Sequence, residues 1–294
     1  MSGRADSTSE ARIIVFDDGR REARSDDLAT EEPLEIRLRA ASRNENDTLP
    51  LHGPRRPAHR AVAVTMRTPG ADAELAAGFL YGEGVLRKAE EISAVGYCDD
   101  PSVDEAKRLN IVNVDLLTAE LPDLEALHRH FHVSSACGVC GKTSLDALRL
   151  NAPAPIGPGP VVPAASLTTL PEKLRSEQGI FATTGGLHAA GLFDESGELL
   201  AVREDVGRHN AVDKLIGWAF LSGRLPLSNH VLMVSGRTSY EILQKAVMAG
   251  VPIVCAVSAP STLAVSVARD FGVTLIGFLR GGRFNVYAGA ERVG

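Results

Sequence analysis

The fold is decided by the stretch VLMVSGRTSYEILQKAVMAGVPIVCAVSAPSTLAVSVARDFGVTLIGF, residues 231–278. Short apolar runs alternate in this stretch with segments that carry the apolar spacing of helices. The runs cover residues 231–234, 253–257 and 273–278, and the helices cover residues 238–249 and 262–271. Short apolar strands that alternate with helices predict parallel βαβ crossovers and a sheet buried on both faces.

The same pattern begins upstream, at about residue 166. An antiparallel pair of strands, joined by a turn at residues 194–197, opens this region and makes the predicted sheet mixed. The further predicted elements are a helix at 166–177, strands at 187–193 and 199–203, a helix at 208–221 and a last strand at 284–287. We therefore assign residues 166–294 to one α/β domain.

The first half of the chain predicts a smaller α+β domain, residues 31–150, that ends in a loop with two cysteines. Its expected strands cover 35–39, 59–67, 92–97 and 109–116, and its expected helices cover 72–86, capped by Asp72, 124–131 and 143–150. Proline and glycine dominate residues 151–165, which we interpret as a linker. Residues 1–30 are crowded with charge and predict a disordered tail, although residues 13–15 could pair as a short edge strand.

Composition narrows the class of protein. The chain has 294 residues, is 44% hydrophobic but only 5% aromatic, and therefore predicts a mostly aliphatic core. A net charge of −6 argues against a general nucleic-acid binder. The first residues lack an apolar run, and the most apolar window, 246–259, contains Pro252 and is shorter than the ~20 residues that a membrane helix needs. We expect a cytoplasmic protein that binds neither nucleic acid nor membrane.

Cys137 and Cys140 form a C-x-x-C pair flanked by glycines and followed by Lys142. A cation and a helix start would both lower the pKa of a thiol and make it a better nucleophile. Four uses remain open at this point: a redox dithiol, a disulfide, a sulfur-carrying nucleophile, or half of a zinc site that histidines 128, 130 and 132 would complete. The other two cysteines, Cys98 and Cys255, receive no role, and Cys255 is expected in the core.

Polar residues follow several of the predicted strands of the α/β domain. The charged segment 203–214 contains Arg208, His209 and Asn210, which helix capping alone does not explain, and we favour a ligand site there. Hydroxyl-rich loops at helix starts suit an anion, and two arginines beside glycines can bind phosphates. The candidate binding residues are His188, His209, Ser235, Arg237, Ser258, Phe278, Leu279, Arg280, Gly281, Gly282 and Arg283.

A family resemblance rests on seven motifs in a fixed order. They are EEPLEI (31–36), GFLYGEG (78–84), ACGVCG (136–141), TGGLH (184–188), EDVGRHNA (204–211), SGR (235–237) and IGF (276–278). Together they resemble the formate dehydrogenase accessory sulfurtransferases, the FdhD family, from about residue 31 to near the C-terminus.

The resemblance implies a function and a fold. Such proteins accept persulfide sulfur from a cysteine desulfurase, here on Cys137 with Cys140 as the second catalytic candidate. They transfer it to the molybdenum or tungsten bis-molybdopterin guanine dinucleotide cofactor, for which GDP or GMP is a mimic, before the cofactor enters formate dehydrogenase. The resemblance also implies a homodimer, a three-layer cytidine-deaminase-like α/β/α domain, and a guanine-dinucleotide site at residues 278–283.

Deaminase chemistry itself is not expected, because it needs an H-x-E…P-C-x-x-C zinc signature. Here His188 is followed by alanines, and Ala136 precedes Cys137. Two alternatives to sulfur transfer remain: a cofactor-binding chaperone with a structural or zinc-binding C-x-x-C, and a dithiol oxidoreductase.

Overall fold

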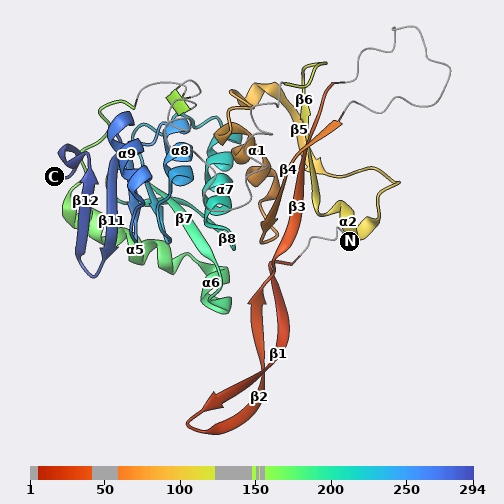
Figure 1. The fold of residues 1–294 in the computed structure, drawn as a ribbon, viewed down its shortest axis with the longest axis horizontal. Helices are drawn as coiled ribbons and strands as arrows, with labels where there is room; N and C mark the ends of the chain where they lie inside the picture. The colour runs from red at the N-terminus through yellow and green to blue at the C-terminus, as the bar shows by residue number, and fades with distance from the viewer. Residues whose placement is uncertain (1–5, 42–58, 123–147, 150–151, 153–155) are drawn as a thin grey trace.

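The computed structural model describes residues 6–41, 59–122, 148–149, 152 and 156–294. They form a mixed α/β protein with three sheets of two, four and six strands. Figure 1 shows the six-stranded sheet and its helices in one half of the molecule, the four-stranded sheet in the other, and the two-stranded sheet as a projecting arm. The predicted helix at 124–131 lies outside the described residues, as does most of the predicted helix at 143–150.

The six-stranded sheet confirms the predicted mixed α/β character of the second half of the chain. Its strand order is β12-β11-β10-β9-β7-β8, in which β9, β10 and β11 are parallel while β7 and β12 run antiparallel to their neighbours. The strands are β7 (His188–Phe193), β8 (Leu199–Asp205), β9 (Val231–Val234), β10 (Ile253–Ala256), β11 (Thr274–Arg280) and β12 (Arg283–Ala288).

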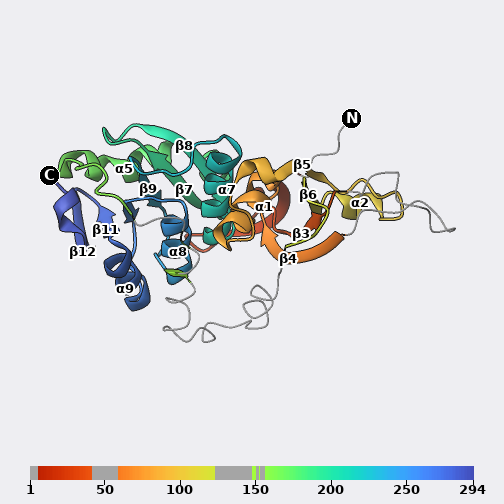
Figure 2. The ribbon, with the colours of Figure 1, turned by 90° about the horizontal axis from the view of Figure 1, so that it is seen from above.

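Helices cover both faces of this sheet, so the unit has three layers (Figure 2). Helix α5 (Ala164–Ser176) packs on one face through Leu167, Leu170 and Leu174. The opposite face is covered by α7 (Arg208–Leu221), α8 (Tyr240–Met248) and α9 (Thr262–Phe271). Two separate apolar clusters result, one on each side of the sheet, because neighbouring side chains of a strand point to opposite faces.

The four-stranded sheet carries one long helix and belongs to the same core as the second half of the chain. Its order is β4-β3-β6-β5, and α1 packs closely on α7. A single apolar cluster runs from the buried Leu34 and Ile36 through Leu80 to Leu215. The elements are β3 (Glu32–Arg39), β4 (His59–Arg67), α1 (Asp72–Gly82), η1 (Ala89–Glu91), β5 (Ile92–Tyr97), α2 (Glu105–Arg108) and β6 (Ile111–Leu116); η2 (Ala290–Arg292) lies near the C-terminus.

The disordered tail predicted for residues 1–30 is wrong for residues 8–29. β1 (Thr8–Asp17) and β2 (Arg20–Ala29) pair antiparallel along their whole length. Asp18 and Gly19 join them with positive φ angles of 44° and 77°, as a tight two-residue hairpin turn requires. Charged side chains on both faces hide the strand alternation, and only the Asp-Gly pair signals the turn.

Asp72 does not cap α1 as predicted. The residue before the helix is Ala71, in the left-handed region, and it makes no side-chain cap. The buried Asp72 carboxylate instead accepts hydrogen bonds from Arg67, with Nη2 to Oδ2 at 3.1 Å, and from the Tyr97 hydroxyl at 3.0 Å. A buried guanidinium needs such a partner, and this need outweighs the capping preference of Asp. In the described part of the chain, no helix is long and apolar enough to cross a membrane.

Candidate functional site

The ends of β8, β9, β10 and β11 and the beginning of β7 lie along one edge of the six-stranded sheet. The helices α7, α8 and α9 each begin directly after one of these strand ends. Their free N–H groups and dipoles make this edge favourable for anions. Ligands of open α/β sheets bind at this kind of edge, which makes it the candidate site.

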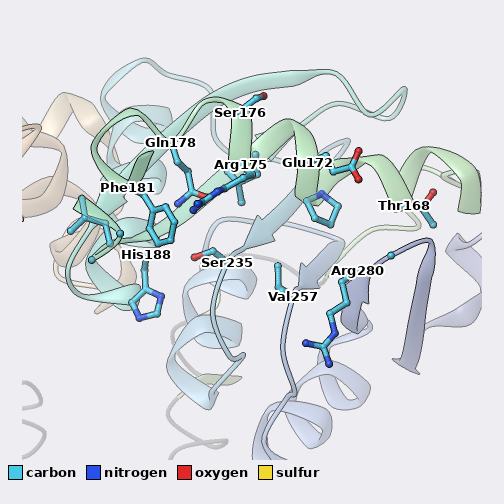
Figure 3. Close-up of a pocket in the computed structure, with 16 residues that line it drawn as sticks. Thr168, Glu172, Arg175, Ser176, Gln178, Phe181, His188, Ser235, Val257 and Arg280 are labelled. Atoms are coloured by element: carbon cyan, nitrogen blue, oxygen red, sulfur yellow. The ribbon is translucent and has the colours of Figure 1, made fainter. Parts of the chain in front are cut away.

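A cavity of about 820 Å³ opens at this edge on the side of α5 (Figure 3). Four residues predicted from the sequence line it: His188, Ser235, Arg280 and Gly281. They come from β7, from the loop after β9 and from the β11–β12 turn. The other residues that line the cavity are Thr168, Pro171, Glu172, Leu174, Arg175, Ser176, Gln178, Phe181, Gly185, Gly186, Leu187 and Val257.

His188 and Ser235 are held by the pairing of β7 with β9. The Ser235 hydroxyl accepts a hydrogen bond from the Ala189 N–H at 2.9 Å, and the Ser235 N–H donates to the Ala189 carbonyl at 3.0 Å. The His188 ring lies against Gly236, where an added Cβ would be 3.3 Å from Nδ1. Burial, together with the nearby Arg208, lowers the pKa of His188, although Asp205 opposes the shift. The imidazole is therefore neutral at pH 7.

His209, in the first turn of α7, belongs to a polar cluster at the same edge. Its Nε2 lies 3.1 Å from the Ser239 hydroxyl and 3.8 Å from a Glu241 carboxylate oxygen. Burial, followed by the charge of Arg208, lowers the pKa of His209 to about 4. The buried Nε of Arg208 has no hydrogen-bond partner among the described residues. The cluster thus offers one cation and two neutral imidazoles, those of His188 and His209, to an anionic group.

The turn between β11 and β12 has the geometry of a two-residue hairpin. Arg280 pairs with Arg283, and Gly281 and Gly282 both have positive φ, 58° and 74°. Phe278 also has a positive φ, 53°, which is strained for an aromatic residue, and the strand pairing is irregular beside it. This irregularity leaves Phe278 only partly buried, and with Arg280, Arg283 and Asn285 it lines a second hollow of about 320 Å³.

Three further predicted residues occupy other positions. The Leu279 side chain is fully buried in the apolar cluster beneath α5, so only its backbone lies at the turn. Ser258 accepts a hydrogen bond from the Phe278 N–H at 3.2 Å through its carbonyl. Arg237 is exposed and does not line the cavity. The two hydroxyl-rich loops are joined, because Thr238 accepts from the Ser261 N–H at 2.9 Å.

Most of the charged segment 203–214, where we favoured a ligand site, holds the fold together. The buried Asp205 carboxylate lies 2.7 Å from the Lys214 ammonium and accepts from the Thr68 N–H at 3.1 Å. Asn210 donates to the Met66 carbonyl at 2.7 Å. These contacts tie α7 to the segment after β4. Only Arg208 and His209 of this segment remain directed to the strand-end cluster.

One wall of the cavity was not predicted from the sequence. Arg175, Gln178 and Phe181 come from the end of α5 and from α6 (Gly179–Thr184), a short helix that was not predicted. Their spacing of three residues would suit one continuous helix, but α5 ends at Ser176 and α6 begins at Gly179, so the break between the two helices determines where these side chains lie. Glu204 holds α6 in place by accepting from the N–H groups of Ile180 and Phe181 at 3.0 and 2.9 Å.

Cys137 and Cys140 lie outside the described residues, together with the histidines at 128, 130 and 132. Cys98 and Cys255 are buried free thiols. Burial raises the pKa of Cys255, which fits the predicted core role. Within the described ranges, no group of three or more His, Cys, Asp or Glu side chains is placed to hold a metal ion.

The fold and this edge define the class first: a mixed α/β protein whose six-stranded sheet presents an arginine-containing cavity at its strand ends. A sequence profile of the FdhD/NarQ family matches residues 56–294, and the chain belongs to this family. It is 49% identical over 289 residues to the sulfur carrier protein FdhD of Streptomyces coelicolor, covering 97% of this chain and 95% of the relative.

Two further relatives agree with this assignment. The sulfur carrier protein FdhD of Mycobacterium tuberculosis is 47% identical over 274 residues, which cover 92% of each chain. The crystal structure of a Desulfotalea psychrophila protein described as a formate dehydrogenase accessory protein matches with a TM-score of 0.70 and 26% identity. That match covers 97% of this chain and 99% of the other, so the fold and the family likeness extend over nearly the whole length.

Proposed function

We propose that this protein is a sulfurtransferase that carries sulfur as a persulfide on Cys137. It takes the sulfur from a cysteine desulfurase and delivers it to a molybdenum or tungsten bis-molybdopterin guanine dinucleotide cofactor, the form that formate dehydrogenase uses. Two lines support the proposal: the relatives named above are sulfur carrier proteins, and His188, Ser235, Arg280 and Gly281 converge on one cavity.

The convergence of these four residues is the observation that carries the cofactor part of the proposal. They are separated by up to 93 positions in the sequence (281 − 188), yet they line one cavity. Arginines bind phosphates well because the guanidinium offers several N–H donors in a plane. The N–H groups at the strand ends and Arg280 therefore suit the diphosphate of the guanine dinucleotide, which is part of the cofactor that receives the sulfur.

The sulfur transfer balances by either of two routes that share a first step. The Cys137 thiolate attacks the outer sulfur of the desulfurase persulfide, so a new S–S bond forms on Cys137 while the desulfurase thiolate leaves. In one route, the Cys140 thiolate then attacks the Cys137 sulfur and expels sulfide to the metal. A Cys137–Cys140 disulfide results, and the two thiols supply the two electrons that reduce the sulfur. In the other route Cys140 takes no part: the outer sulfur passes to the metal of the cargo while the Cys137 thiolate leaves, and the reduced metal supplies the two electrons.

Mass spectrometry tests the sulfur-carrying step. The protein is incubated with ³⁴S-cysteine and a cysteine desulfurase, and peptides are analysed without reductant. We expect one added sulfur on the peptide that contains Cys137, and none in Cys137→Ser. The buried Cys255→Ala serves as the matched control and should load like the parent. An unmodified Cys137 peptide, under conditions that load a known acceptor, would contradict the proposal.

Metal analysis separates this proposal from a cofactor chaperone with a zinc-binding or structural cysteine pair. Stoichiometric zinc that Cys137→Ser removes would favour the chaperone. Turnover of small disulfides would favour a dithiol oxidoreductase instead. We expect neither from a sulfur carrier.

The remaining parts of the proposal concern fold type, location and assembly. We propose a cytidine-deaminase-like α/β/α unit, in keeping with the three layers observed, in a cytoplasmic homodimer that contacts the desulfurase and the formate dehydrogenase catalytic subunit. The β1–β2 arm exposes the apolar side chains of Ile14 and Phe16, the latter 73% exposed. A two-stranded ribbon with such side chains is only marginally stable alone, which fits a second copy against it. Light scattering of the full chain and of a variant lacking residues 1–29 tests this assembly, since we expect only the full chain to be dimeric.

A further inference from the structure

The outer edge of strand β2 is unpaired in the described part of the chain. β2 pairs with β1 on one side, and no other described strand joins this two-stranded sheet. Residues 20–28 are all exposed, and Figure 1 shows the arm projecting away from both other sheets. The strand approaches the body of the protein at its root, where an added Cβ on Gly186 would be 3.6 Å from the Cβ of Ala29. An open edge of this kind is a template for pairing with another strand.

The geometry of the hairpin decides which backbone groups of β2 face the open edge. The closing pair of the two-residue turn, Asp17 and Arg20, is hydrogen-bonded, and bonded and non-bonded pairs alternate from there along an antiparallel ladder. The even-numbered residues of β2 therefore direct N–H and C=O toward β1, and the odd-numbered residues direct theirs toward the open edge. Accordingly, the Asp27 N–H donates to the neighbouring Asp26 carboxylate, at 3.1 Å.

The charged side chains of β2 make the strand complementary to a second copy of itself. Along one face they follow the order Arg20, Glu22, Arg24, Asp26. In an antiparallel pair centred on Ala23, Arg20 lies opposite Asp26 of the second copy, and Glu22 lies opposite Arg24. The two-fold axis repeats both contacts. The even-numbered residues form the non-hydrogen-bonded pairs of this ladder, in which facing side chains lie closest, and opposite charges there stabilise the pairing.

The charges disfavour the two neighbouring registers. Because a two-fold axis keeps the same face of both copies on one side of the ribbon, neighbouring registers differ by two residues. A pair centred on Glu22 would place Glu22 opposite itself and Arg20 opposite Arg24. A pair centred on Arg24 would place Arg24 opposite itself and Glu22 opposite Asp26. Like charges directly opposite each other are destabilising. Charge that only protects an edge needs no particular order, so this order indicates a specific partner.

We propose that two copies of this chain join through their β2 strands, which pair antiparallel about a two-fold axis at Ala23. A four-stranded ribbon results, in the order β1-β2-β2-β1. The inference rests on the homodimer of the proposed function and deepens it by naming the strand, the register and the charges. On the face opposite the ion pairs, Ile14 and Ala23 of both copies form one apolar row, with the exposed Phe16 beside it. The added strands also supply the stability that an isolated hairpin lacks.

Two charge reversals, each on the full chain, test the pairing. Glu22→Lys brings two positive charges together at each Glu22–Arg24 contact, and Arg24→Glu brings two negative charges together there. Each variant alone should dimerise at least tenfold more weakly than the parent in analytical ultracentrifugation. An equimolar mixture should regain parent-like affinity as a heterodimer, because the introduced lysine then meets the introduced glutamate. This recovery would also show that both variants fold.

The matched control is Arg12→Glu, which reverses an exposed arginine of the same hairpin on β1, opposite Ser25. It should dimerise within about twofold of the parent. Salt provides a second measurement, because ions screen attraction and repulsion alike. Raising NaCl from about 0.05 M to about 0.5 M should weaken the parent dimer and strengthen the Glu22→Lys dimer.

The outcomes separate this inference from the proposed function. Parent-like dimerisation of both Glu22→Lys and Arg24→Glu would overturn the β2 pairing and leave the homodimer standing. Weakened variants that do not recover on mixing would overturn the register centred on Ala23. A monomeric parent would overturn the pairing together with the homodimer. Persulfide loading of Cys137, measured on the same samples, reports on sulfur transfer independently of all three.

Discussion

Gly78 of α1 and Gly217 of α7 lie against each other's helix backbone. A Cβ on Gly78 would be 1.9 Å from the Asp213 carbonyl oxygen, and one on Gly217 would be 1.8 Å from the Glu74 carbonyl oxygen. No side chain fits at either position, so the two helices cross at a distance that only glycine allows. The four-stranded unit is therefore attached to the α/β unit by a close helix crossing as well as by the chain.

Gly217→Ala should destabilise the protein strongly. Overpacking a core typically lowers the free energy of unfolding by about 1–3 kcal/mol. A Cβ that clashes with the backbone of a packed helix should cost about 3 kcal/mol or more. Urea unfolding of the purified variant measures the loss. Gly179→Ala is the matched control, because a Cβ there meets nothing within 4 Å, and it should remain within about 0.5 kcal/mol of the parent.

The buried pair of Asp205 and Lys214 predicts a second stability effect. Their side chains are 0% and 3% exposed, with 2.7 Å between Nζ and Oδ2. Lys214→Met leaves the carboxylate buried without its cation, which should cost about 3–5 kcal/mol. Asp205→Asn combined with Lys214→Met should be more stable than Lys214→Met alone, because no unpaired charge remains.

Urea midpoints of the two single variants and the double variant form the test. The exposed pair of Lys173 and Glu198 supplies the comparison, and Glu198→Gln should change stability by less than about 1 kcal/mol. Equal losses from Lys214→Met and Glu198→Gln would show that the buried pair does not stabilise the link between the units.

The local regularities of the sequence predicted the sheet well. The predicted bounds are confirmed for the strand Val231–Val234 and for the helices Arg208–Leu221 and Thr262–Phe271. Buried strands require runs of aliphatic residues, and amphipathic helices require apolar residues three or four positions apart, so both leave a clear pattern in the sequence. The prediction for residues 8–29 failed for the same reason. A two-stranded ribbon that is exposed on both faces has no buried face, so its sequence lacks the alternation of apolar and polar residues that marks a strand.

The candidate site was predictable only where strand order determines it. His188 and Ser235 could be grouped because strand ends of an α/β sheet share an edge. Gln178 and Phe181 could not, because their place depends on how α5 and α6 fold back over that edge. Leu279 was predicted as a binding residue together with its neighbours in the turn. The irregular strand pairing beside Phe278 directs the Leu279 side chain into the core instead.

His209 predicts a loss of stability in mild acid. Burial and Arg208 lower its folded pKa to about 4, below the unfolded value near 6.5. The unfolded state then binds more protons between these values, so stability falls as pH drops from about 6.5 to 4. Because the side chain is 33% exposed, we discount the effect to ~1–2 kcal/mol.

Thermal unfolding at pH 5 and pH 7.5 measures this effect. His209→Gln should lose less stability than the parent between these two pH values, while the exposed His59→Gln should follow the parent. Parallel curves for His209→Gln and the parent would mean that other groups cause the acid loss.

Arg283 and Arg280 should respond differently to the length of the nucleotide phosphate. Arg280 lines both the main cavity and the second hollow, whereas Arg283 lines the second hollow and is not among the residues that line the main cavity. In the proposed function the guanine end of the cofactor enters the main cavity, so we expect the first phosphate to contact Arg280 and a second phosphate to extend toward Arg283 in the second hollow. Arg280→Ala should therefore weaken GMP and GDP alike, about tenfold or more, while Arg283→Ala should weaken GDP about tenfold and GMP less than threefold. Persulfide loading of Cys137 should be unchanged in both variants.

Titration of each variant with GMP and with GDP measures these affinities. An equal loss of GMP and GDP affinity in Arg283→Ala would place the first phosphate at the β12 side of the turn.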